Sequence, residues 1–402
     1  MRRIKKIFVL SAILMIFSLI CSCSTNQIKT NVNQDSNNYI ANEDFQNYIS
    51  EMSSFVKVKD GYYFTSDALL FYYDTENNQA YPVCNKTNCT HSDSNCQAYL
   101  SPLKFYPEMS MYYYDNALYL LGREKKGASS ESVYIYQISL ENFKQKKAAY
   151  LFDSASSISV VCIIHRGYVY FSYDGGEMEE TKATLYRTKL GELSKNSPEK
   201  IFEFNGIGAS IARLSAYGNK LFFNTSSYSD LQGNGYETVL NCMDIHTLEN
   251  KTIPQRKYSH FADEGKVYYF KDENTVAYYD LSNQKHKIFC KIDGPCYISA
   301  DDNYIYFDNL QSIIVGNSKE SDRKIFVYDK SGKYVTEITP KNPKDDCYFG
   351  GDDMMIFKEN IDGETAESDG AKGYYVLDKP QLKSPDKQFI DMEKYYGTYQ
   401  NI

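Results

Sequence analysis

The chain has no tryptophan and only ten prolines, although it carries 39 tyrosines and 22 phenylalanines. Helical periodicity is not sustained anywhere after residue 20, which argues against a helical domain. Tyrosine and phenylalanine in a proline-poor chain are typical of half-buried pleated strands. We therefore expect an all-β fold.

Common enzyme motifs are absent as well. The chain has no Gly-x-Ser-x-Gly elbow, no His-Glu-x-x-His motif and no P-loop, and Gly206-Ile207-Gly208 lacks the third glycine of a dinucleotide fingerprint. The net charge is −8, and −12 without the four positive charges of residues 2–6. A negative protein is a poor ligand for nucleic acid or anionic lipid. We therefore expect no nucleic-acid partner, and favour neutral or cationic partners.

A degenerate unit recurs seven times at intervals of about 37 to 56 residues, the length of a four-stranded propeller blade. Each copy pairs an aromatic strand with a second strand that often ends in Tyr-Asp. The aromatic strands lie at 61–64, 118–120, 167–171, 220–223, 267–270, 304–307 and 355–357. This repeat predicts a seven-bladed β-propeller over residues 45–402, with six or eight blades as alternatives. Either 388–394 or 45–51 should supply the last outer strand.

The connections between the expected strands sort into two faces. If the strands of each unit are named A to D, the A–B turns are tight and most C–D turns are short. The B–C connections are long around 123–131, 174–182, 226–236, 309–322 and 359–372. In an up-and-down sheet the B–C and D–A connections share one face, here called the loop face, opposite a turn face. Binding is expected on the loop face.

The densest chemical pattern is Cys-x4-Cys-x-His-x4-Cys, formed by Cys84, Cys89, His91 and Cys96 in the connection after the first unit. Thiolates and imidazole are preferred ligands of Zn²⁺, and the loop is too short to fold around its own core. The pattern predicts a zinc site. A disulfide within the loop is the main alternative, because cysteines outside the cell membrane oxidise readily. The third interpretation is a loop of unpaired thiols with a histidine that has no role in it.

Two of the long connections are acidic. This pattern indicates either a solvated rim or a site for Ca²⁺ or a cationic ligand. The carboxylates are Asp174, Glu177, Glu179 and Glu180 in one loop, and Asp362, Glu364, Glu367 and Asp369 in the other.

The first 22 residues are expected to be a signal peptide, with a basic start and an apolar stretch over 7–20. Ile20 lies three places before Cys23 and Ser22 directly before it, as in a bacterial lipobox. Cys23 is therefore the expected lipidation site; the alternative is an ordinary cleaved signal. Residues 23–44 hold few hydrophobic clusters, so we expect a flexible linker between the lipid and the propeller.

The lipobox, the linker, the aromatic repeats and the run Pro82 to Ala98 together resemble a group of propeller-type surface lipoproteins of low-GC Gram-positive bacteria. The aromatic strands also resemble, distantly, the YWTD propellers of LDL-receptor-type proteins, although tryptophan is absent here. The resemblance implies a propeller anchored by lipid on the outer face of the cell membrane. It transfers no catalytic residues.

We expect a non-enzymatic binding module for an extracellular peptide, protein or glycan. The alternative is a hydrolase or lyase acting on carbohydrate. Two carboxylates and a tyrosine close together at the propeller mouth would favour the enzyme.

Replacing Cys23 with alanine should release the protein from the membrane fraction or leave its signal peptide uncleaved, because Cys23 is the expected acyl acceptor. Membrane fractionation and intact-mass measurement test this. A Cys23→Ala protein that still carries lipid would contradict the assignment.

Overall fold

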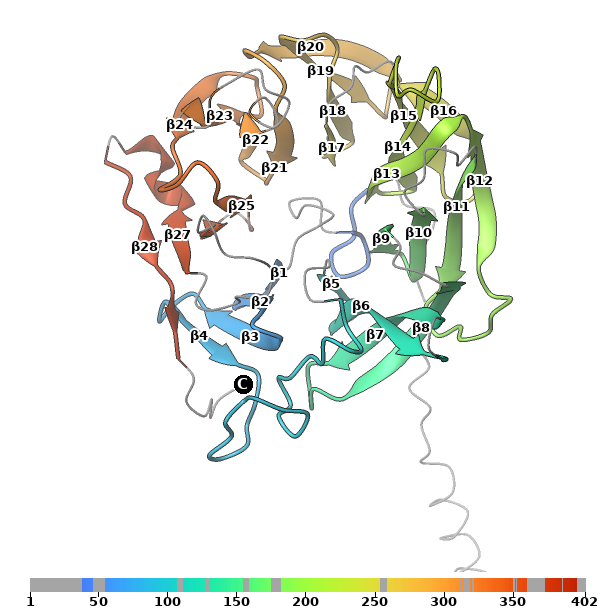
Figure 1. The fold of residues 1–402 in the computed structure, drawn as a ribbon. Coiled ribbons are helices and arrows are strands. Elements are labelled where there is room, and N and C mark those ends of the chain that lie inside the picture. The colour runs from blue at the N-terminus through green and yellow to red at the C-terminus, as the bar shows by residue number, and fades with distance from the viewer. Residues whose placement is uncertain are drawn as a thin grey trace, which may run out of the picture. The chain divides into compact units, whose positions relative to one another are not determined.

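The computed structural model describes residues 38–45, 55–106, 111–127, 130–154, 159–174, 182–253, 259–310, 313, 319, 322–349, 351, 353–359, 373–384 and 386–395. The expected signal peptide, Cys23 and the linker up to residue 37 lie outside these residues. Within them, seven antiparallel sheets follow one another along the chain, each in the order of its strands. Figure 1 shows these sheets as blades around a common axis. The seven-bladed propeller predicted from the repeat is confirmed.

Each of the first four blades contains four consecutive antiparallel strands. Blade 1 contains β1 (Phe55–Val58), β2 (Gly61–Ser66), β3 (Leu69–Asp74) and β4 (Gln79–Pro82). Blade 2 contains β5 (Met111–Tyr114), β6 (Ala117–Lys125), β7 (Glu131–Ser139) and β8 (Gln145–Ser154). Blade 3 contains β9 (Ser159–His165), β10 (Tyr168–Asp174), β11 (Lys182–Lys189) and β12 (Glu199–Asn205), and blade 4 contains β13 (Ile207–Tyr217), β14 (Lys220–Tyr228), β15 (Glu237–Asp244) and β16 (Asn250–Ile253).

On average, the strands of the last three blades are shorter than those of blades 2 to 4. Blade 5 contains β17 (His260–Asp263), β18 (Lys266–Phe270), β19 (Thr275–Asp280) and β20 (Lys285–Lys291). Blade 6 contains β21 (Tyr297–Ala300), β22 (Tyr304–Asp308), β23 (Ile325–Asp329) and β24 (Tyr334–Ile338). Blade 7 contains β25 (Asp346–Tyr348), β26 (Met354–Lys358), β27 (Tyr374–Asp378) and β28 (Ile390–Asp391), with the 3₁₀ turn η2 (Lys379–Lys383) between its last two strands. No helix in the described part of the chain is long and apolar enough to cross a membrane.

The C-terminal segment closes the ring. After β28 completes blade 7, β29 (Glu393–Lys394) pairs in parallel with β4 at the outer edge of blade 1. Tyr395 continues this pairing by donating its amide to the Ala80 carbonyl at 2.8 Å. The expectation that 388–394 supplies the last outer strand is therefore confirmed. Backbone hydrogen bonds between β29 and β4 thus join the C-terminal segment to the first blade.

Aromatic side chains of the second strands fill the space between blades. Tyr62, Tyr119, Tyr170, Tyr268 and Tyr306 each expose 1% or less of their surface. Burying one such ring stabilises the fold by roughly 2 kcal/mol, so its repetition from blade to blade makes the blades adhere. This explains how the chain forms a propeller without tryptophan.

The aspartates that end the repeat have a structural role. In blades 1, 4, 5 and 6 the aspartate is the last residue of the third strand, and its carboxylate accepts backbone N–H groups of the C–D turn that follows. Asp244 Oδ1, for example, accepts from His246 at 2.9 Å and Thr247 at 3.0 Å. Asp74, Asp280 and Asp329 do the same. These are Asx turns, which reverse the chain in few residues.

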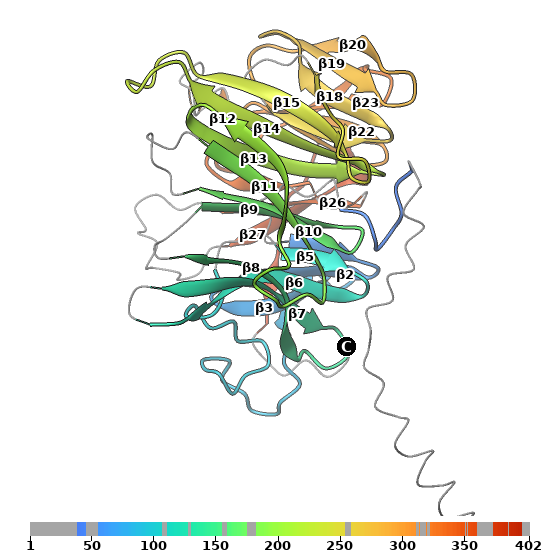
Figure 2. The same ribbon diagram turned by 90° about the vertical axis from the view of Figure 1, so that its right-hand side faces the viewer.

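The chain enters the propeller on the turn face. Residues 38–45 lie against the A–B turns of blades 2 and 3, where Asp44 is buried and accepts two hydrogen bonds from Arg166 at 2.7 and 3.2 Å. The Phe45 amide donates to His165 Nδ1 at 3.1 Å. Figure 2 shows this segment beside the turn ends of the blades. The loop face, at the opposite strand ends, is not covered by it.

Replacing Asp244 with asparagine should lower the free energy of unfolding at pH 7 by about 1–2 kcal/mol. Burial alone would raise the pKa of Asp244, but the hydrogen bond from Lys220 at 2.6 Å and two backbone amides lower it to about 2. The folded pKa lies below the unfolded value of about 3.9, so this stability is present above pH ~4 and is lost as the pH falls toward 2. Denaturation midpoints measured from pH 7 to pH 2 should therefore converge for the two proteins. A difference that persists at pH 2 would contradict this assignment.

Candidate functional site: a cysteine and histidine cluster on the loop face

The connection from β4 to β5 is held at the loop-face end of blade 1. Its first residue, Val83, donates its amide to the Leu70 carbonyl, and Leu70 donates to Ala98 further along the loop, both at 2.8 Å. Leu100 donates to the Ala68 carbonyl at 2.7 Å. The loop therefore leaves and returns beside the same B–C turn, and residues 84–97 project from it.

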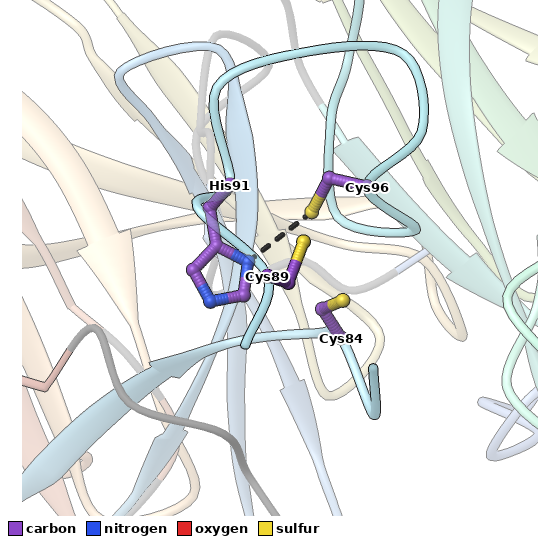
Figure 3. Close-up of side chains that lie close together, drawn as sticks. All are labelled: Cys84, Cys89, His91 and Cys96. Carbon is purple, nitrogen blue, oxygen red and sulfur yellow. Dashed lines mark hydrogen bonds between the residues drawn. The ribbon is translucent and has the colours of Figure 1, made fainter. Parts of the chain in front are cut away.

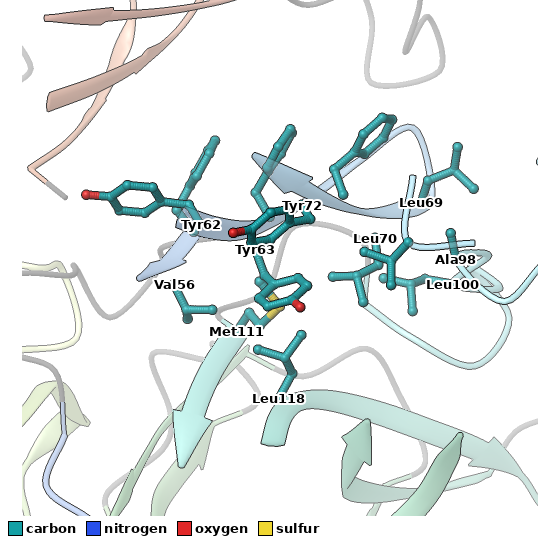
Figure 4. Packing of buried hydrophobic residues seen from close by; sticks show 14 of the residues in the cluster. Val56, Tyr62, Tyr63, Leu69, Leu70, Tyr72, Ala98, Leu100, Met111 and Leu118 are labelled. Atoms are coloured by element: carbon teal, nitrogen blue, oxygen red, sulfur yellow. The ribbon is translucent and has the colours of Figure 1, made fainter. Parts of the chain in front are cut away.

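Apolar packing fixes the base of this projection. Ala98 and Leu100 lie against Leu69 and Leu70 in Figure 4, at the edge of the core that blades 1 and 2 share. Val83 and Ala98 are fully buried, and Leu100 exposes 5% of its surface. The base of the loop is thus part of the propeller core, whereas residues 85–95 have few apolar contacts of their own.

The structure brings the four predicted ligands together. One ligand atom each of Cys84, Cys89, His91 and Cys96 lies within 4.8 Å of the others. His91 Nδ1 lies 3.2 Å from Cys96 Sγ, and Figure 3 shows the imidazole and the three thiols converging. In a tetrahedral site with Zn–S bonds of about 2.3 Å, the ligand atoms are ~3.8 Å apart. The cluster therefore has the ligands and the approximate spacing of a four-coordinate metal site.

The backbone of the loop explains how short segments bring these side chains inward. Asn88 and His91 adopt left-handed conformations, with φ of 56° and 55°. Asn and His tolerate this region better than most residues. Asp93 then turns the chain, because its carboxylate accepts the Asn95 amide at 2.8 Å and its carbonyl accepts the Cys96 amide at 3.0 Å.

The cluster is buried and electrostatically uneven. Burial is the main cause that raises the pKa of Cys96 to about 12, and a thiolate at Cys84 raises it further. Burial acts in the same direction on Cys84, but hydrogen bonds from the amides of Lys86 and Gln97 and from the side chains of Cys89 and Cys96 together outweigh it and lower the pKa of Cys84. Without a cation, Cys84 is thus the favoured thiolate. A divalent cation would stabilise three thiolates together.

The disulfide alternative accounts for less of this geometry. Cys84, Cys89 and Cys96 are all unpaired in the structure. A disulfide also gives no role to His91, which is 5% exposed and whose Nδ1 lies 3.2 Å from Cys96 Sγ. A metal at the centre of the cluster would bind Nδ1 and account for the inward position of the ring.

Other histidines have structural partners. His165 Nε2 lies 2.8 Å from the Gly218 carbonyl, and His286 Nδ1 lies 2.6 Å from the Tyr269 hydroxyl. Of the acidic residues expected to form a rim or a Ca²⁺ site, Asp174 is the last residue of β10. The others, Glu177, Glu179, Glu180 and the group from Asp362 to Asp369, lie outside the described residues.

The sequence did not point to one further group on the loop face. Arg213 of blade 4 lies over the ring of Tyr297 of blade 6, and His260 of blade 5 lies beside them. These residues come from three blades and form no motif, so no local sequence signal could have found them.

Comparison with known proteins gives no family assignment. No known protein-family model matches the chain, and no curated protein sequence matches it. Similar folds among solved structures include a computationally designed protein, Ika8, with a TM-score of 0.48 and 10% identity over 88% of this chain and 91% of that one. An uncharacterized protein from Listeria monocytogenes EGD-e has a TM-score of 0.41 and 13% identity over 70% and 83% of the two chains. BamB from Moraxella catarrhalis has a TM-score of 0.37 and 8% identity over 87% and 89%. Likenesses at this level say nothing about function.

Proposed function

We propose that this protein is a lipid-anchored, extracytoplasmic propeller whose loop face binds a peptide, protein or glycan, and that Zn²⁺ holds the Cys84–Cys96 loop in place on that face. The observation that carries the proposal is the cluster itself. Three thiols and one imidazole from the protein would fill all four positions around Zn²⁺ and leave none for water or substrate, which is the arrangement of structural rather than catalytic zinc.

The point of chain entry supports this orientation. Residues 38–45 join the propeller at its turn face. A tether at Cys23, which we place on the outer face of the cell membrane, would connect to that side of the propeller. The loop face would then remain free for a partner.

The arrangement of carboxylates and tyrosines gives little support to the alternative, a carbohydrate hydrolase or lyase. Among the described residues, Asp301 contacts Tyr306 and Lys379, and Asp353 contacts Tyr62 and Lys57. Both aspartates lie in A–B turns of the turn face, and each forms an ion pair between neighbouring blades. At the loop-face end of blade 7, Tyr375 donates a hydrogen bond to Asp345 at 2.6 Å, but both side chains are fully buried.

Protein purified under reducing conditions should carry about one equivalent of zinc, and Cys89→Ser should lose it. Thermal unfolding of the blades should shift little, since their stability comes from contacts between neighbours. Metal analysis and circular dichroism measure both quantities. His91→Ala should also weaken zinc binding, by tenfold or more, while Cys162→Ser, a buried cysteine outside the cluster, is the matched control.

Intact-mass measurement separates this proposal from a disulfide. A metal-free protein with a mapped bond between two cysteines of the loop, and with no response to His91→Ala, would exclude the zinc site.

Fluorescently labelled mature protein should bind a subset of members on peptide or glycan arrays. Cys89→Ser should reduce that binding at least fivefold, because the loop loses its fixed shape. Lys266→Glu, in blade 5 at the turn face, should leave the binding unchanged. Binding that is lost equally in both variants, or cleavage of the bound glycan, would contradict a binding role of the loop face.

A further inference from the structure

The innermost strand of blade 4 contains a bulge at Arg213. In the pairing of β13 with β14, Ala212 faces Asn224 and Ser215 faces Phe222, so two residues stand opposite one. Arg213 is one of these two and has a φ of 54°. A bulge reorients a side chain relative to the regular strand. Here it changes the direction of the guanidinium.

The Arg213 side chain reaches from blade 4 to blade 6, past blade 5. Its guanidinium carbon lies 5.2 Å from the ring centroid of Tyr297, the first residue of β21 in blade 6. Blade 5 lies between blades 4 and 6, and its inner strand β17 faces the axis, as Figure 1 shows. Arg213 therefore passes on the axis side of β17. Both Arg213 and Tyr297 are half-buried, so part of each reaches solvent.

Hydrogen bonds fix the inner strands around this contact. Ser215 Oγ lies 3.2 Å from His260 Nε2, which joins β13 to β17. Ser259 Oγ accepts the Ile298 amide at 2.8 Å and donates to the Cys296 carbonyl at 2.9 Å, which joins the start of β17 to β21. His260 and Tyr297 begin strands A of their blades, so the group lies at the loop-face end.

Arg213 differs from the other arginines that the structure describes. Arg123, Arg166, Arg187 and Arg323 each form an ion pair with a carboxylate. Arg213 has no hydrogen bond or ion pair with any described residue, and its only ring contact is Tyr297. The chain as a whole is negative, with a net charge of −8. An unpaired guanidinium in such a protein is available for an external anion.

The neighbouring histidine does not neutralise or repeat this charge. Burial, and secondarily the positive charge of Arg213, lower the pKa of His260 to about 3, so the imidazole is neutral at physiological pH. Its Nδ1 is buried and has no hydrogen-bond partner among the described residues. The group thus combines one cation, one aromatic face and one unsatisfied polar atom.

We propose that Arg213, held by the Tyr297 ring, binds a carboxylate of the ligand at the axis end of the loop face. This inference rests on the proposed binding role of that face. A single guanidinium matches a singly charged, planar carboxylate, to which it can donate two parallel hydrogen bonds.

The backbone of Arg213 allows a structural role to be separated from a binding role. A left-handed conformation is unfavourable for arginine and costs glycine almost nothing. Arg213→Gly relieves this strain while it removes the contact with Tyr297, and the two effects are similar in size. If Arg213 serves binding, Arg213→Gly should keep or raise the thermal midpoint and should still lose the carboxylate.

The test is a titration of the mature chain with succinate, its uncharged counterpart succinamide, and sulfate, followed by calorimetry or by NMR. We expect succinate to bind with millimolar affinity, and succinamide and sulfate to bind at least tenfold more weakly. Arg213→Gln and Arg213→Gly should weaken succinate binding tenfold or more, and Arg213→Lys less, because lysine keeps the charge without the paired donors. Arg187→Gln, which removes an arginine of blade 3 already paired with Glu199, is the matched control and should have no effect.

Equal binding of succinate by the wild type and Arg213→Gln would overturn the inference, and so would equal binding of sulfate. A clear fall in the thermal midpoint of Arg213→Gly would assign Arg213 a structural role instead. Array binding that survives in Arg213→Gln while succinate binding is absent from all proteins would reject the carboxylate site and leave the proposed function intact. Loss of array binding in Cys89→Ser but not in Arg213→Gln would likewise reject the carboxylate site and leave the proposed function intact.

Discussion

The parallel pairing of β29 with β4 is the interaction on which the propeller depends, because it joins blade 7 to blade 1. Each blade packs mainly against its two neighbours, so an open row of blades would expose an aromatic face at both ends. The buried rings of Phe55 and Tyr374, 5.5 Å apart across the junction of blades 1 and 7, show what closure protects. Asp353 and Lys57 form an ion pair across the same junction at 2.9 Å. Because the ring is closed, every blade has a neighbour on both sides.

The order of the strands also places the turns that stabilise the fold on one face and the variable loops on the other. Meandering strands place tight turns on one face, where aspartates such as Asp244 and Asp280 accept backbone amides and shape each turn. That face also receives the entering chain through Asp44 and Arg166. The opposite face has no such repeated constraint, so its connections can differ in length and composition from blade to blade. The Cys84–Cys96 loop and the group around Arg213 both lie there.

The sequence predicted features that depend on local spacing. The aromatic repeat indicated seven blades, and the last outer strand was expected within 388–394, because strand alternation and turn residues are local signals. The Cys/His cluster was also predictable, since its four ligands lie within 13 residues. The contact of Arg213 with Tyr297 could not be predicted, because the two residues are 84 positions apart and the contact depends on a bulge for which the sequence gives no signal. The anchor at Cys23 remains a prediction from the sequence.

The two sites on the loop face differ in how the fold supports them. Residues 85–95 of the Cys/His loop bury little apolar surface, so their shape depends on a cross-link among the four ligands and can be lost without unfolding the blades. Arg213 instead stands on the most constrained part of the propeller, between inner strands tied together by Ser215, His260 and Ser259. A rigid ring can hold a strained backbone conformation that an isolated strand would relax. A metal can therefore fix the conformation of the Cys/His loop, whereas the inner strands of the propeller hold the positive charge of Arg213 at one position.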